Sequence, residues 1–260
     1  ENQLIARADA VFTGGYSLYE AKRHLHPNIH PFPSSVDVGH FETARQTLDV
    51  PADQASIAHP IFGYYGVIDE RLDLALIEAV AKARPDHSFV FIGPVAKIAP
   101  QDLPGAPNIH YLGQKAYADL PAYISGWDVA LMPFALNEAT TFISPTKTPE
   151  YLAGGRPIVS TPVPDVVRHY GDVEGVFLAD TPAAFASACD RALELKRSGG
   201  QWLEAVDVML ARSSWDKTFQ DMNRMVGEVL DPPRPSKPSR PTGLRSVTST
   251  PAVPYDYLIV

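Results

Sequence analysis

The chain has 260 residues, 45% of them hydrophobic, and a formal net charge of −8 at pH 7. This size allows one large domain, or one domain with appendages, and the acidic balance excludes non-specific binding to nucleic acid. The sequence has no apolar run long enough to cross a bilayer and no signal-peptide pattern. A single cysteine, Cys189, excludes a disulfide framework, so we expect a cytoplasmic protein. Because of the negative charge, we expect no nucleic-acid partner.

Residues 1–40 predict a short segment of two strands and one helix. Residues 10–13 and 29–32 have the apolar character of strands, and residues 17–25 have that of a helix. This is too little to bury a core of its own, so we expect residues 1–40 to be the terminal segment of another domain. Three histidines close together here would be separated by helix and strand geometry, so no metal site is expected: His24, His26 and His30.

Residues 41–230 alternate short apolar strands with helices. One helical pattern ends at Pro85, and the pair Thr181-Pro182 opens another. Strands that are apolar on both faces indicate a parallel sheet covered on both sides, which predicts a doubly wound, Rossmann-like α/β fold. The predicted strands are residues 61–66, 88–92, 109–112, 128–132, 157–161 and 176–178.

The C-terminal part of the chain changes character after a last helix. This helix is predicted over residues 215–230, with Ser214 as its cap. Residues 231–254 are rich in Pro, Ser and Thr, which predicts a disordered, Pro-rich linker. Residues 255–260 form an apolar run, and we expect it to be the first strand of a following domain.

The run Ser144-Pro145-Thr146-Lys147 is the most informative part of the sequence. Hydroxyls and a lysine at the start of a helix attract anions, because the first backbone N–H groups of a helix are free. One turn later, Glu150 is placed to accept hydrogen bonds from a diol. Loops that follow parallel strands meet at one edge of the sheet, so the turn after Gly66 opens at the same edge. A phosphate site beside a diol acceptor indicates a nucleoside diphosphate, here one that carries a sugar.

Two other interpretations of this run have to be considered. Strand–loop–helix units with Gly and Pro occur in every α/β protein, and Glu150 could simply face solvent. The spacing Ser144-x-x-Lys147 also matches the nucleophile motif of penicillin-binding enzymes. The companion motif Lys-Thr-Gly is missing, since the sequence has Lys147-Thr148-Pro149, and we treat the match as chance.

Residues 8–230 resemble the C-terminal, donor-binding half of a GT-B glycosyltransferase of the large retaining family 4, also called group 1. The most specific match is Ser-Pro-Thr-Lys-x-x-Glu-Tyr-Leu-Ala-Gly-Gly-Arg-Pro-Ile-Val-Ser-Thr at residues 144–161. The segment Pro33-Ser34-Ser35-Val36-Asp37 is similar to the family's interdomain crossover. Shorter matches lie at residues 8–13, 63–66, 111–113 and 128–133.

The resemblance implies a set of nucleotide-sugar-binding residues. The glutamate that matches Glu150 binds the ribose hydroxyls in such enzymes, the loop at residues 144–147 contacts the diphosphate, and residues 113–115 lie near the base. Gly66 would let backbone amides approach the phosphates, because it has no Cβ. The implied binding residues are Gly66, Gln114, Lys115, Ser144, Thr146, Lys147 and Glu150.

The implied reaction is transfer of a sugar from a nucleoside diphosphate, with UDP preferred, to a sugar or lipid-linked glycan acceptor in cell-surface polysaccharide synthesis. In this family the N-terminal domain supplies acceptor-site and further catalytic groups. We therefore expect that missing domain as a partner, assign no catalytic residue, and expect this portion alone to be inactive. No cofactor is expected in it, and contact with a membrane would come through the parent protein.

Two departures from the family pattern stand out. An acidic residue is usual eight positions before Glu150, and here that position is Phe142. The usual Arg and Lys after the first glycine turn are replaced by Val67 and Ile68, which leaves Arg71 as the nearest cation. Two alternatives therefore stay open: a non-catalytic nucleotide-sugar-binding module, and an enzyme similar to the sugar-nucleotide 2-epimerases.

The last six residues carry a second resemblance. Tyr-Asp-Tyr-Leu-Ile-Val is similar to the first strand of a flavoprotein Rossmann domain, specifically that of UDP-galactopyranose mutase. A Gly-x-Gly-x-x-Gly turn would follow that strand in such a domain. The resemblance implies a fused mutase that binds FAD, and both parts would then handle nucleotide sugars.

Overall fold

The computed structural model describes residues 1–46, 48–231 and 257–259. The chain divides into two compact units, one of Ser34–Trp215 and one that joins Glu1–Pro33 to the chain from Asp216 onward. The predicted linker at residues 231–254 lies outside the described residues, apart from its first position. Within the described residues, no helix combines the length and the apolar character needed to cross a bilayer.

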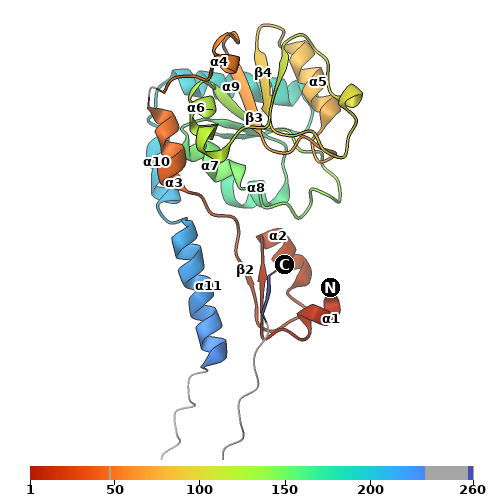
Figure 1. Ribbon diagram of the computed structural model, residues 1–260, viewed down its shortest axis with the longest axis vertical. Helices are drawn as coiled ribbons and strands as arrows, with labels where there is room; N and C mark the ends of the chain where they lie inside the picture. The colour runs from red at the N-terminus through yellow and green to blue at the C-terminus, as the bar shows by residue number, and fades with distance from the viewer. Residues whose placement is uncertain (47, 232–256, 260) are drawn as a thin grey trace, which may run out of the picture. The chain divides into compact units, whose positions relative to one another are not determined.

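A parallel sheet of six strands forms the larger unit, in the order β5-β4-β3-β6-β7-β8 (Figure 1). This order is that of a doubly wound, Rossmann-like sheet, so the predicted fold class is confirmed. All six predicted strands are present, each within one residue of its predicted ends. The strands are β3 (Ile61–Tyr65), β4 (Ser88–Ile92), β5 (Ile109–Gly113), β6 (Val129–Met132), β7 (Ile158–Ser160) and β8 (Val176–Leu178).

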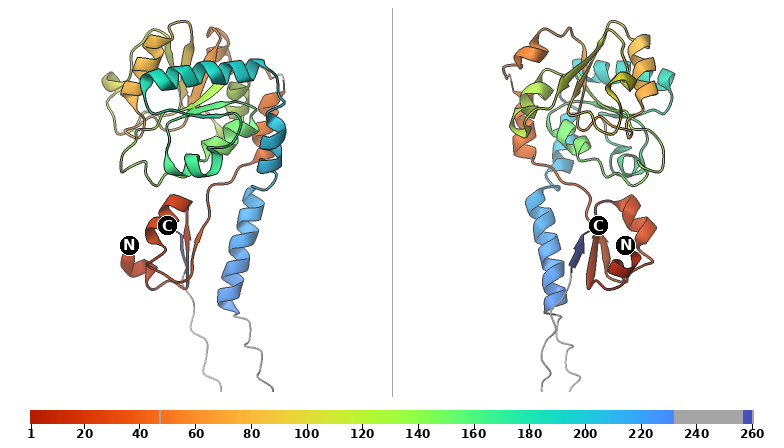
Figure 2. Two further views of the ribbon diagram at one scale, coloured as in Figure 1. Left: turned by 180° about the vertical axis from the view of Figure 1, so that it is seen from behind. Right: turned by 45° about the vertical axis from the view of Figure 1, so that its right-hand side comes forward.

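Helices cover both faces of this sheet (Figures 1 and 2). On one face, α5 (Leu74–Ala83) packs against α9 (Pro182–Arg197), and on the other lie α6 (Leu120–Ser125) and α7 (Lys147–Ala153). Right-handed crossovers that leave β3 and β6 in opposite directions place the helices in this way. Every residue of β3, β4, β6 and β7 is buried as a result, which explains why these strands are apolar throughout.

Side-chain caps define where two of these helices begin. Thr181 caps α9, since its hydroxyl accepts a hydrogen bond from the Ala184 N–H at 3.3 Å, as the sequence predicts. Asp73 caps α5 by accepting from the Leu76 N–H at 2.8 Å, so the apolar position Leu72 lies before the helix. The remaining helices of the unit are α3 (Val38–Glu42), α4 (Ala52–Ala55), α8 (Pro164–Tyr170) and α10 (Leu203–Leu210), with short 3₁₀ turns at Thr43–Arg45, Pro100–Asp102 and Tyr117–Asp119.

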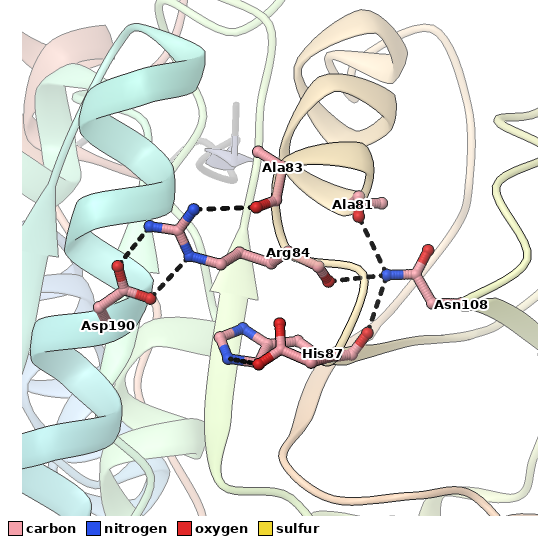
Figure 3. A network of polar contacts seen from close by, with 7 residues as sticks. Ala81, Ala83, Arg84, His87, Asn108 and Asp190 are labelled. Atoms are coloured by element: carbon pink, nitrogen blue, oxygen red, sulfur yellow. Dashed lines mark hydrogen bonds and ion pairs between the residues drawn. The ribbon is translucent and has the colours of Figure 1, made fainter.

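The amino-terminal edge of the sheet is fixed by a polar network at the end of α5 (Figure 3). Arg84 forms a bidentate ion pair with Asp190 of α9. The Asn108 amide donates to the carbonyl oxygens of Ala81, Arg84 and His87 at 2.8–3.0 Å. These bonds connect the end of α5 to the segments that lead into β4 and β5. The amino-terminal edge thus carries a structural network, whereas ligands of open α/β sheets bind beyond the carboxyl ends of the strands.

The smaller unit contains a parallel pair, β1 (Ala10–Thr13) and β2 (Ile29–Pro31). The predicted helix at residues 17–25 is present as α2 (Tyr16–Lys22), and a short α1 (Asn2–Ile5) precedes β1. Ile5, Val11 and Ile29 form the small buried cluster of this unit. The long helix α11 (Trp215–Leu230) has the bounds that the sequence predicts.

Two observations bear on the predicted domain boundaries. The units divide at Pro33 rather than near residue 40, because α3 packs against α6 and α7 of the larger unit. Residues Tyr257–Ile259 form β9, which pairs with β1 in the sheet of the smaller unit. Their assignment to a following flavin-binding domain stays a prediction.

Candidate functional site

Three glycines mark the carboxyl edge of the sheet, at the ends of β3, β4 and β5. Gly66, Gly93 and Gly113 have φ values of 142°, 140° and 69°, a region that L side chains rarely adopt. Hydrogen bonds connect the three turns. The Gly66 N–H donates to the carbonyl of Ile92 at 2.8 Å, and the Gly93 N–H donates to the carbonyl of Gly113 at 2.9 Å. The backbone at this edge is therefore tightly packed and has a fixed shape.

Lys147 lies against the first of these glycines. A Cβ on Gly66 would be 2.4 Å from the Lys147 Cε, so the lysine occupies the space that a side chain there would need. Its ammonium lies over the ring of Tyr64, 5.8 Å from the centroid. Burial lowers the pKa of Lys147, against the opposing attraction of Glu150. Because α7 has only seven residues, we assign the attraction for an anion here to the lysine more than to the helix terminus.

A second cation, Arg71, is fixed beside this glycine turn. Its Nε donates to both carboxylate oxygens of Asp69, at 2.9 and 3.0 Å, and the Asp69 side chain is only 4% exposed. Burial alone would raise the pKa of Asp69, but hydrogen bonds from Arg71 outweigh it and the net shift is downward. The positive charge of Arg71 also contributes to the lowered pKa of Lys147, after burial.

Glu150 lies one turn along α7, half-buried behind Lys147. The hydroxyl of Tyr65, the last residue of β3, donates a hydrogen bond to its Oε2. Burial raises the pKa of Glu150, while this hydrogen bond and the charge of Lys147 act in the opposite direction. The structure therefore brings together three predicted residues, Gly66, Lys147 and Glu150, at the point where the strand order reverses between β3 and β6.

The hydroxyls of the predicted phosphate loop have different surroundings. Ser144 contacts the crossover segment, since its Oγ accepts from the Ser34 N–H and its carbonyl accepts from the Ser34 hydroxyl, both at 3.4 Å. Thr146 occupies the N-cap position of α7, but its side chain makes no capping hydrogen bond. The loop matching the family's phosphate loop is thus in contact with the segment matching the family's crossover.

The residues predicted to lie near a base are less clearly part of this group. Lys115 forms an ion pair with Asp53 at 2.5 Å and lies over the ring of Tyr123, so its charge is directed toward α4 and α6. Gln114 is exposed. Tyr117, which follows them, is stacked on His40 with ring centroids 4.4 Å apart and feels the charge of Glu150.

No acidic side chain stands at the family's first carboxylate position. Phe142 is there instead, with 48% of its surface exposed. Among the residues that the structure describes, no group of three His, Cys, Asp or Glu residues could ligate a metal ion.

Residues 59–195 match the family model "Glycosyl transferases group 1". The chain belongs to the group 1 glycosyltransferases. Among curated relatives, TuaH of Bacillus subtilis (strain 168), named as a teichuronic acid biosynthesis glycosyltransferase, is 26% identical over 240 residues. That alignment covers 87% of this chain and 59% of TuaH, so the chain spans about three fifths of the length of this relative.

Solved structures confirm the GT-B-like fold. Anabaena HepE, in a complex with UDP and glucose, superposes with a TM-score of 0.67 at 14% identity, over 87% of this chain and 65% of HepE. Sucrose-phosphate synthase from Thermosynechococcus elongatus gives a TM-score of 0.65 at 17% identity, over 88% of this chain and 60% of the synthase. At these identities the likeness concerns the fold alone.

Sequence reasoning missed two members of the group at this edge. Tyr65 is an aromatic residue at the end of a buried strand, and no local pattern indicates that its hydroxyl reaches a carboxylate 85 positions later. Asp69 lies two residues before Arg71, and an Asp-x-Arg pair just after a glycine turn could have indicated a fixed cation. Both belong to the same edge of this group 1 glycosyltransferase domain as Lys147 and Glu150.

Proposed function

We propose that this group 1 glycosyltransferase domain binds the nucleoside-diphosphate sugar, a UDP-sugar, for retaining transfer in cell-surface polysaccharide synthesis. The observation that carries the proposal is the grouping of Lys147 and Glu150 beside Gly66. A diphosphate is bound well by a cation that lies beside backbone amides which the phosphates can approach. The ribose needs a hydrogen-bond acceptor for its hydroxyls, here about one turn of α7 after that cation. The Anabaena HepE structures with UDP and with UDP-glucose support UDP as the nucleotide, and the name of TuaH supports a cell-surface polysaccharide.

In the proposed reaction, the bond between the sugar's anomeric carbon and the diphosphate oxygen breaks. A bond from that carbon to the oxygen of an acceptor hydroxyl forms, and the hydroxyl loses its proton to the departing diphosphate or to solvent. The diphosphate gains negative charge as it leaves. Lys147 and Arg71 are two fixed cations close to where that charge would develop, so they would stabilise it more than the bound substrate. Arg71 takes the place of the cations that the family has directly after its first glycine turn.

The rest of the reaction would need residues outside this chain's donor-binding unit. The acceptor, a sugar or a lipid-linked glycan, would be bound mainly by an N-terminal domain of the kind that the GT-B architecture has. No cofactor is assigned to the donor site. The expected fusion to a UDP-galactopyranose mutase, with its FAD, stays a prediction that nothing in the comparisons supports.

One observation favours a second candidate function. Phe142 replaces the carboxylate that the family places eight residues before Glu150, and this position belongs to the loop that leads to Ser144. A domain that retains nucleotide contacts but lacks this donor-sugar contact would be a non-catalytic nucleotide-sugar-binding module. The 2-epimerase alternative has no comparable observation in its favour.

Calorimetric titration of the purified chain with UDP, GDP and ADP tests the binding step. UDP should bind more tightly than GDP or ADP, and failure of all three to bind at millimolar concentration would refute the proposal. The parent protein should then be assayed for transfer from a labelled UDP-sugar to a glycan acceptor. Binding of UDP without transfer by the parent would favour the non-catalytic module.

A further inference from the structure

Tyr65 is fixed in place by its neighbours. Its backbone N–H donates to the hydroxyl of Tyr151 at 3.0 Å. Its ring meets that of Tyr151 edge-on, with centroids 5.1 Å apart, and lies parallel to that of Phe41. The ring of Trp127 is 6.3 Å away. Packing against three rings restricts the rotamers of this side chain, so the core of the domain constrains the position of its hydroxyl.

The Tyr65 hydroxyl acts only as a donor toward Glu150. Burial, with the nearby charge of Glu150, raises the pKa of Tyr65 well above 10, so the phenol keeps its proton at every physiological pH. Within the described part of the chain, this hydroxyl is the sole hydrogen-bond donor to the Glu150 side chain, and it reaches Oε2. Among the described residues Oε1 therefore has no hydrogen-bond donor, and its two lone pairs are left for ligand hydroxyls.

We propose that Tyr65 is the positioning residue that orients the Glu150 carboxylate and thereby makes the site discriminate between ribonucleotides and nucleotides without ribose hydroxyls. This inference rests on the proposed function, since it assumes that Glu150 faces the ribose. By occupying Oε2, the phenol fixes the plane of the carboxylate and directs Oε1 to the ligand. A hydrogen bond from a neutral donor also favours the ionised form, and a carboxylate accepts more strongly than a carboxylic acid.

Other charged or titratable groups face the same carboxylate and must be included in the test. Lys147 lies on the same helix, Tyr117 comes from the turn after β5, and the Tyr151 hydroxyl lies close to the Tyr65 backbone. Of these groups, only Tyr65 donates a hydrogen bond to Glu150. Removing the phenol oxygen should therefore change the carboxylate while the other groups remain.

The test is the Tyr65→Phe variant, titrated by calorimetry with UDP and with 2′,3′-dideoxy-UDP. We expect affinity for UDP to fall about three- to tenfold, the size of one ordinary hydrogen bond, because Tyr65 acts on the ligand only through Glu150. Affinity for the dideoxy compound should change little. The ratio of the two affinities is measured on the same sample, so a loss of folded protein cancels. On the acid side, UDP binding should weaken at a higher pH in the variant, because Glu150 loses a bond that favours its ionised form.

Tyr111→Phe is the matched control, since it also removes a tyrosine hydroxyl that makes a hydrogen bond, here to the carbonyl of Pro104 at 3.1 Å. It should leave the affinity ratio unchanged. Adding Tyr65→Phe to Glu150→Gln should change the ratio no further than Glu150→Gln alone. One outcome would refute only the inference about Tyr65: UDP binds, Glu150→Gln lowers the ratio of UDP affinity to dideoxy-UDP affinity, and Tyr65→Phe leaves that ratio unchanged. The proposed function would then stand. If the wild-type protein binds no nucleotide, the proposed function fails first.

Discussion

Gly93 and Gly66 are in backbone contact. A Cβ added to Gly93 would lie 1.9 Å from the carbonyl oxygen of Gly66, and the φ of Gly93 is 140°. Neither the contact nor the conformation tolerates a side chain, so the turn after β4 supports the turn after β3. The shape of the proposed phosphate site therefore depends on the turn at Gly93 as well as on Gly66 itself.

Gly93→Ala should destabilise the domain and weaken UDP binding together. Strain at this φ and the overlap with the Gly66 backbone should lower the free energy of unfolding by roughly 2–4 kcal/mol. Thermal unfolding followed by circular dichroism measures this loss. Gly105→Ala is the matched control, because a Cβ there meets no atom within 4 Å. Equal melting temperatures for the two variants would show that the glycine contact is not needed.

The sequence was sufficient to predict the sheet, because its strands are short, apolar on both faces and bounded by turn residues. Lys147 and Glu150 fall in one continuous motif, so the sequence could propose them together, and their role in binding stays a prediction. Partners that are distant in the chain were not predictable. The Tyr65–Glu150 bond joins residues 85 positions apart, and the Lys115–Asp53 pair joins residues 62 apart. Such pairs depend on which strands become neighbours, and local patterns do not contain that information.

Arg71→Gln separates a role in binding from a role in stability. It should weaken UDP binding severalfold and leave uridine binding unchanged, because uridine has no phosphate. It should also lower the melting temperature, since the buried charge of Asp69 would keep its backbone N–H donor but lose its guanidinium partner. The double variant Asp69→Asn with Arg71→Gln should recover the melting temperature but not the affinity. Recovery of both would show that Arg71 has a structural role only.

Lys147→Ala should weaken UDP binding far more than uridine binding, and added salt should reduce the difference. In the wild-type protein, UDP affinity should fall with rising pH from a point below the ordinary lysine pKa of 10.5, because burial lowers the pKa of Lys147 and a bound diphosphate would raise it. This pH dependence should be absent from Lys147→Ala. Lys82→Ala, which removes an exposed lysine paired with Glu78, is the control. A slope that persists in Lys147→Ala would assign the titration to another group.

His87 should make the domain less stable as the pH falls below neutrality. Burial lowers its pKa from 6.5, and its Nδ1 has no hydrogen-bond partner (Figure 3). An unfolded histidine takes up a proton near pH 6.5, so unfolding is favoured from there down to the lowered pKa of the folded state. Urea unfolding at pH 7.5 and 5.5 measures the loss, which should be smaller in His87→Gln. The exposed His24→Gln should retain the full loss, and an equal loss in all three proteins would contradict this assignment.

The most direct test of the account is the affinity of Glu150→Gln for UDP and for 2′,3′-dideoxy-UDP. Charge-assisted hydrogen bonds to both ribose hydroxyls are worth roughly 1.5–3 kcal/mol, so affinity for UDP should fall about tenfold or more. The dideoxy compound, which lacks both hydroxyls, should bind the variant and the wild-type protein about equally. Glu194→Gln, the same change at an exposed position of α9, should alter neither affinity. Unchanged UDP binding by Glu150→Gln, or unfolding of that variant, would contradict the assignment of this edge of the sheet as the nucleotide site.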